Sequence, residues 1–82
     1  MDFSKRNQNE KEFGNWIETI VGGREYWFDV AGRKGGMARY VKEVDKNEVT
    51  IAFRQEIFDG LGAMIEIHEK YPVDKGHIKI QR

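Results

Sequence analysis

The chain has 82 residues, which is enough for one small domain and too few for two. It carries 14 basic and 14 acidic side chains, and this zero formal charge disfavours a DNA-binding protein, which needs a basic excess. Cysteine is absent, which excludes disulfides, thiolate zinc sites and cysteine nucleophiles, and the 12% aromatic content is not typical of a disordered chain.

The first twelve residues are polar apart from Met1 and Phe3 and show no sustained hydrophobic period. We expect residues 1–12 to form a polar N-terminal arm or a short helix, and residues 13–82 to form a single β-rich domain. The polar start does not match a secretory signal peptide, and no apolar run is long enough to span a bilayer. We therefore expect a soluble, cytoplasmic protein that makes no contact with a membrane.

Residues 13–21 fit two kinds of secondary structure. Five apolar residues lie at the spacing of one helical face: Phe13, Trp16, Ile17, Ile20 and Val21. Residues 16–21 are nevertheless rich in aromatic and β-branched side chains, and Gly22 and Gly23 could form a two-residue hairpin turn into the next segment. The composition favours a hairpin here, with a helix as the alternative.

Four later segments alternate apolar and polar residues, which predicts strands at 24–30, 37–44, 48–58 and 63–71, and a last short strand places Ile78 and Ile80 inward. Glycine-containing turns separate the segments at intervals that suit consecutive strands. The predicted fold is mainly β: an antiparallel β-meander of four to six strands with a polar N-terminal arm or short helix against one side. A small α+β domain is the alternative.

The hydrophobic pattern also predicts how two of these strands pair. A four-residue loop at 45–48 puts Val44 opposite Val49 and Tyr40 opposite Phe53, so that both inward sets coincide. The core then occupies one face of the sheet. The other face holds mainly charged residues: Arg39, Arg54, Glu66, His68 and Lys70.

The next connection needs an odd number of loop residues, or a bulge, for Ile57 and Ile65 to face the same side. A three-residue loop at 59–61 is preferred, because a five-residue loop sets Glu56 against Glu66, a like-charge pair. The shorter loop predicts three facing pairs: Arg54 with Glu66, Phe53 with Ile67, and Ala52 with His68.

The two histidines are the candidate catalytic residues. His68 lies on the polar side of a predicted strand, and His77 follows a turn-like segment at 72–76 that could bring the two imidazoles together. With Arg54 and Lys70 beside them, they resemble the minimum set of a metal-independent ribonuclease. One imidazole would take the 2′-hydroxyl proton, the other would protonate the leaving oxygen, and a cation would stabilise the developing charge. The alternative is that both are ordinary surface residues.

Glu66, His68, Asp74 and His77 supply nitrogen and oxygen ligands of the type that first-row metals accept. However, the sequence has no HExxH motif and no other dense ligand spacing. We therefore predict neither a metal nor a cofactor.

Four residues are candidates for binding. Arg33 and Lys34 lie among glycines at 32–36, where backbone amides and two cations could hold an anion, although the order of a nucleotide-binding loop is missing and a tight turn also explains the glycines. Alternation sends Trp27 to the face of Arg39, and a tryptophan beside an arginine can stack on a base, anchor a protein interface or simply cover a second small cluster.

No motif assigns an activity, so the functional expectation rests on these candidates. We favour a small binding or regulatory module that acts through protein–protein contacts or self-association over an enzyme. The alternatives are the toxin-like ribonuclease and a non-catalytic RNA-binding domain. The expected partner is therefore another protein or a second copy of this chain, with RNA possible and DNA not expected.

Overall fold

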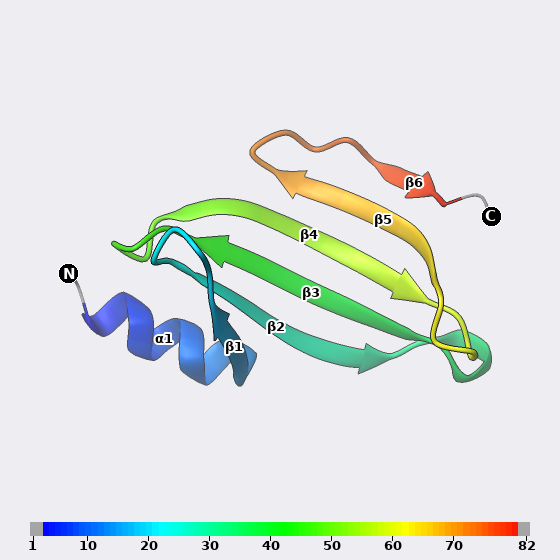
Figure 1. The fold of residues 1–82 in the computed structure, drawn as a ribbon. Coiled ribbons are helices and arrows are strands. Elements are labelled where there is room, and N and C mark those ends of the chain that lie inside the picture. The colour runs from blue at the N-terminus through cyan, green and yellow to red at the C-terminus, as the bar shows by residue number, and fades with distance from the viewer. Residues whose placement is uncertain (1–2, 81–82) are drawn as a thin grey trace.

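The fold is a six-stranded antiparallel meander preceded by one helix, as seen in a computed structural model that describes residues 3–80 (Figure 1). The mainly β meander predicted from the sequence is confirmed. The sheet order follows the chain order from β1 to β6. The elements are α1 (Phe3–Phe13), β1 (Asn15–Glu18), β2 (Arg24–Ala31), the single 3₁₀ turn η1 (Arg33–Gly35), β3 (Met37–Val44), β4 (Thr50–Phe58), β5 (Met64–Tyr71) and β6 (His77–Lys79).

The N-terminal segment is helical, and the segment after it is a strand. Helix α1 ends at Phe13 because Gly14 adopts the left-handed conformation, at φ +81°, and donates its amide to the Glu10 carbonyl oxygen. The chain then enters β1, which pairs with β2 from Asn15 opposite Trp27 to Glu18 opposite Arg24. The preference for a hairpin over a helix is therefore confirmed for β1.

Three hairpin connections share one loop geometry, a turn of three residues whose last member is left-handed. The loops span residues 20–22, 46–48 and 60–62, and their left-handed residues are Gly22 (φ +84°), Glu48 (φ +63°) and Gly62 (φ +84°). The predicted bounds of these connections are wrong: the two-residue turn at Gly22–Gly23, the four-residue loop at 45–48 and the loop at 59–61. The β4–β5 loop has the predicted length of three residues but begins one residue later, at Gly60. The left-handed residue at the end of each loop changes where the ladder begins.

The β3–β4 register differs from the predicted one for this reason. Phe53 lies opposite Lys42, and Tyr40 lies opposite Gln55. A register shift between Glu43 and Val44 accommodates the extra residue of the turn. The predicted pairing is thus displaced along β3 without moving the aromatic side chains off their face.

The β4–β5 ladder contains a bulge that turns β5 over. Phe58 pairs with Met64, as the rejected five-residue loop implied, but the register then shifts so that Glu56 faces Ile67 and not Glu66. The like-charge pair is avoided, and the three predicted facing pairs do not occur. Gln55 lies opposite His68, so His68 shares the face of Tyr40, opposite to the face predicted for it.

Helix α1 packs on one face of the sheet, here called the helix face. Phe13 lies 6.0 Å from Tyr26 and 5.5 Å from Phe28, measured between ring centroids. Tyr26 and Val44 are completely buried there, and Phe28 and Phe53 pack against them. The opposite face, here called the open face, has no helix over it among residues 3–80. In that described part of the chain, α1 is far too short and polar to cross a bilayer.

Candidate functional site

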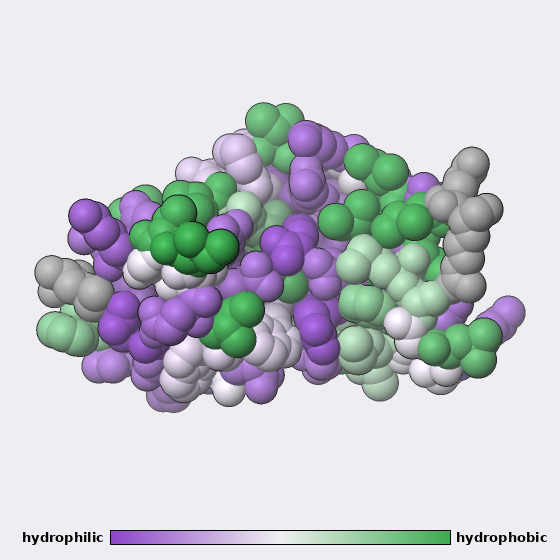
Figure 2. Space-filling view, in the orientation of Figure 1, coloured by the Kyte–Doolittle hydropathy of each residue, from purple (hydrophilic) through white to green (hydrophobic). Residues whose placement is uncertain are grey.

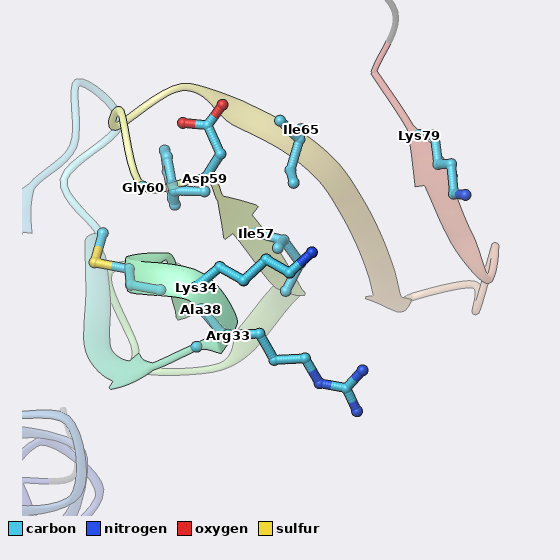
Figure 3. Close-up of a pocket in the computed structure, with 11 residues that line it drawn as sticks. Arg33, Lys34, Ala38, Ile57, Asp59, Gly60, Ile65 and Lys79 are labelled. Carbon is cyan, nitrogen blue, oxygen red and sulfur yellow. The ribbon is translucent and has the colours of Figure 1, made fainter.

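A groove of about 830 Å³ lies on the helix face, at the end of the sheet that α1 does not cover (Figure 3). Its floor is apolar and comes from β3, β4 and the start of β5, through Ala38, Ile57 and Ile65. Its rim is basic. Arg33 and Lys34 come from η1 on one side, and Lys79 comes from β6 on the other.

The η1 turn is held against the β4–β5 connection by backbone contacts. The amides of Gly32 and Gly36 close the turn by donating to the carbonyl oxygens of Gly36 and Arg33, respectively. A Cβ on Gly36 would collide with the carbonyl oxygen of Phe58, so only glycine permits this approach. Lys34 is left-handed, at φ +53°, and its side chain extends over the floor toward Ile57 (Figure 3).

The three cations of the rim outnumber the single Asp59 carboxylate in the lining of the groove. Within residues 3–80, Arg33, Lys34 and Lys79 have no carboxylate at ion-pair distance. By contrast, each of the four other arginines in that range has at least one acidic partner: Arg6, Arg24, Arg39 and Arg54. The groove is therefore suited to an anionic group attached to an apolar one.

The histidine pair lies beside the groove on the same face. His68 and His77 are cross-strand partners, and their ring centroids are 4.4 Å apart. The expected return of the chain after residues 72–76 is thus confirmed. Each ring also has a carboxylate partner: His68 Nε2 lies 2.6 Å from Asp74, and His77 Nδ1 lies 3.3 Å from Glu66.

The two rings differ in how accessible their nitrogens are. The second nitrogen of His68, Nδ1, is buried without a hydrogen-bond partner, so neither nitrogen of this ring is open to a substrate. His77 is more accessible, with 48% of its side chain exposed against 14% for His68. The Gly76 amide and the His68 ring lower the pKa of Asp74.

Arg54 and Lys70, the cations expected beside the histidines, lie on different faces. Arg54 is on the open face, where it contacts Glu56 at 2.7 Å and Glu25 at 3.6 Å. Lys70 is on the helix face, with its ammonium group 5.4 Å from the ring centroid of Tyr40. The structure therefore brings Lys70, but not Arg54, to the face of the histidines.

The predicted binding residues also fall in two places. Arg33 and Lys34 belong to the groove, whereas Trp27 and Arg39 belong to the open face. The Arg39 guanidinium lies 5.7 Å from the Trp27 ring centroid and makes two hydrogen bonds to Asp29, at 2.8 and 3.1 Å. The bonds to Asp29 raise the pKa of Arg39, and this group is already paired within the chain.

The sequence did not indicate that Lys79 lines a groove together with Ile57 and Ile65. Ile57 faces Glu66, which in turn faces Lys79, so this row exists only in the bulged register of β4, β5 and β6. The isolated sequence around residue 79 shows a lysine between two isoleucines and nothing more. Lys79 reaches the groove because β6 pairs with β5, and the local sequence pattern does not reveal that register.

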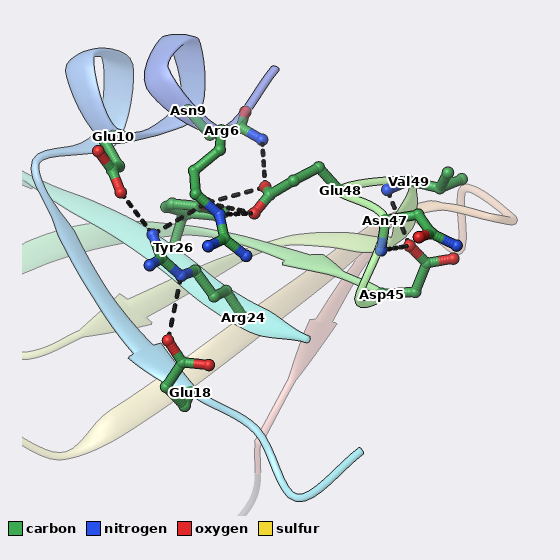
Figure 4. Close-up of polar contacts among 10 residues, drawn as sticks. All are labelled: Arg6, Asn9, Glu10, Glu18, Arg24, Tyr26, Asp45, Asn47, Glu48 and Val49. Atoms are coloured by element: carbon green, nitrogen blue, oxygen red, sulfur yellow. Dashed lines mark hydrogen bonds and ion pairs between the residues drawn. The ribbon is translucent and has the colours of Figure 1, made fainter. Parts of the chain in front are cut away.

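A buried carboxylate network was also missed, at the opposite end of the sheet (Figure 4). Glu48 is 3% exposed and accepts hydrogen bonds from Tyr26 at 2.8 Å, Arg6 at 2.9 Å and Asn9 at 3.2 Å. Burial acts to raise the pKa of Glu48, but the bonds from Arg6, Tyr26 and Asn9 together outweigh it and lower the pKa. This network connects α1 to the β3–β4 turn and is structural.

Two further findings bear on the site. No group of three or more histidine, aspartate or glutamate side chains within residues 3–80 is arranged to hold a metal ion. Comparison of the chain with family models, curated protein sequences and solved structures found no match.

Proposed function

We propose that this chain is a small binding module that acts through protein–protein contacts and takes an acidic, partly apolar segment of a partner into the groove. The observation that carries the proposal is the combination on one surface of an apolar floor with three cations, Arg33, Lys34 and Lys79, that have no carboxylate partner within residues 3–80.

The two parts of the groove contribute differently to binding. Burying an apolar side chain against Ile57 and Ile65 removes hydrocarbon surface from water, which drives association. The rim cations attract a carboxylate, select the orientation of the segment and raise the association rate. Arg33 can also bind a carboxylate through two parallel hydrogen bonds. Both parts are exposed to solvent, so we expect modest affinity that weakens with salt.

The test is a titration of the ¹⁵N-labelled protein with an acetylated peptide of alternating leucine and aspartate, followed by two-dimensional NMR. We expect the amide signals of Ala38, Ile57 and Ile65 to shift, and a peptide with asparagine in place of aspartate to bind at least about fivefold more weakly, equivalent to about 1 kcal/mol. Equal binding of the two peptides, or shifts confined to other regions, would refute the proposal.

A matched pair of variants shows whether the rim cation matters. Lys34→Gly removes a groove cation, and Lys46→Gly removes an exposed lysine in the β3–β4 turn at the other end of the sheet. We expect Lys34→Gly, but not Lys46→Gly, to weaken the binding of the aspartate peptide. Single-stranded RNA is titrated in parallel, and RNA binding in the groove without peptide binding would replace this proposal with the RNA-binding alternative.

A second candidate function is the metal-independent ribonuclease, which the 4.4 Å separation of the His68 and His77 rings favours. Because both nitrogens of His68 are occupied or buried, His77 would have to be the group that reaches the 2′-hydroxyl or the leaving oxygen. Cleavage of RNA in chelator by the wild type, with loss in His77→Ala, would support it. No cleavage by the wild type would eliminate it.

A further inference from the structure

The β1–β2 turn carries two exposed aliphatic residues, here called the apolar tip: Ile20 and Val21. Relative to the fully exposed reference, Ile20 is 105% and Val21 is 70% accessible. Of the two other turns of this geometry, the β3–β4 turn has Lys46 and Asn47 at these positions, and the β4–β5 turn has Gly60 and the exposed Leu61. Among the three, the β1–β2 turn alone places two aliphatic residues there. Two aliphatic side chains that pack against so little contribute little to folding, so their exposure points to an intermolecular contact.

The apolar tip and the groove lie at opposite ends of the molecule. The tip adjoins the β3–β4 turn, since Gly22 lies next to Lys46, whereas the groove lies at the β2–β3 and β4–β5 connections. The molecule is 41 Å long, and Figure 2 shows hydrophobic side chains gathered separately near these two ends. The tip of one molecule therefore cannot reach its own groove.

The two surfaces are complementary in chemistry. The tip presents two aliphatic side chains, and Glu18, two residues before Ile20, has a carboxylate side chain that is 67% exposed. The groove presents an apolar floor and a rim of cations without partners, as described above. Glu18 does contact Arg24, at 3.3 Å, but Arg24 has a closer acidic partner in Glu10, at 2.6 Å.

From this complementarity, we infer that the apolar tip of one copy of the chain binds in the groove of a second copy. The inference rests on the proposed function, because it identifies one segment of the kind that the groove accepts. The two surfaces are different parts of the molecule, so the contact is heterologous. The expected association is weak and depends on concentration, because the contact area is small.

The test uses two variants that each remove one half of the contact. The tip variant is Ile20→Ser with Val21→Ser, and the groove variant is Arg33→Ser with Lys34→Gly. Both sets of side chains are exposed, so we expect both variants to keep the wild-type dispersion of NMR signals. Val73→Ser is the matched control, because Val73 is also exposed, at 62%, and does not line the groove.

Sedimentation equilibrium over a hundredfold range of concentration, up to about 1 mM, gives the readout. The mean mass of the wild type and of the control should rise with concentration, while each variant alone stays at the mass of one chain. An equimolar mixture of the two variants should reach the mass of two chains and no more, because only one intact tip and one intact groove can meet. A wild type that stays monomeric, a tip variant that still associates, or a mixture that stays monomeric would overturn the inference.

The proposed function is tested separately by titrating the tip variant with the leucine–aspartate peptide, because its groove is intact and unoccupied. Peptide binding together with a monomeric wild type removes the self-association and leaves the proposed function. If the peptide does not bind but the mixture of variants forms a dimer, the proposed binding of an acidic partner segment is refuted and the self-association stands.

Discussion

The replacement Glu48→Gln tests the buried network that connects α1 to the sheet. Glutamine has the same shape as glutamate and leaves the left-handed backbone in place. It removes the negative charge of the carboxylate that accepts hydrogen bonds from Tyr26, Arg6 and Asn9. A hydrogen bond to a charged group contributes about 1.5–3 kcal/mol and a neutral one about 0.5–1.5 kcal/mol. With about 1 kcal/mol lost per bond, and less for the partly exposed Arg6, we expect the free energy of unfolding to fall by about 2–3 kcal/mol.

The pH dependence of this effect follows from the direction of the pKa shift. The pKa of Glu48 is lower in the folded protein than its ordinary value of 4.5, so ionised Glu48 stabilises the fold. That contribution is fully present above the unfolded pKa and is lost as the pH falls through the folded pKa. The difference between wild type and Glu48→Gln should therefore be largest at pH 7 and should shrink on acidification below about pH 4.5.

Urea unfolding followed by tryptophan fluorescence measures both quantities. Glu18→Gln is the control, since this carboxylate is largely exposed and its pairing with Arg24 contributes little, under about 1 kcal/mol. A Glu48→Gln variant within about 0.5 kcal/mol of the wild type at pH 7, or a difference that is the same at pH 3 and pH 7, would refute this account of the network.

Three further predictions concern the groove and the β5–β6 connection. Gly36→Ala should lower the free energy of unfolding by about 1–3 kcal/mol in urea, because its Cβ meets the Phe58 carbonyl oxygen, and unchanged stability would contradict that contact. Lys34→Gly should raise the free energy of unfolding by about 0.5–1 kcal/mol, because glycine relieves the left-handed strain of about 1–2 kcal/mol and costs only about 0.5–1 kcal/mol in added freedom of the unfolded chain. Lys46→Gly should lower the free energy of unfolding, because Lys46 has no positive φ to relieve. Asp74→Asn should speed hydrogen exchange of the Ile80 amide, which is bonded to the Ile65 carbonyl, by loosening β6, and an unchanged rate would show that the His68 contact does not hold this strand.

Part of the candidate site could be predicted from sequence because it is local. Arg33 and Lys34 are adjacent in one turn, and His77 follows a proline- and glycine-bounded turn that returns the chain toward His68. Such proximity needs only the turn and not the rest of the fold. The partners of Arg54 and the contribution of Lys79 were beyond this reasoning, because they depend on which residues of distant strands lie opposite one another.

The sequence by itself determined the strands, their order and their antiparallel connection. The signals are the alternation of apolar and polar residues and the glycine-containing turns, and both act over a few residues. The register and the face of each side chain were decided by the tertiary structure. Glu48 adopts a conformation usually left to glycine because its carboxylate is stabilised by groups from α1 and β2, and no local pattern contains that information. The bulge beside Phe58 likewise turns His68 to the helix face, since a shift of one residue exchanges the two faces of a strand.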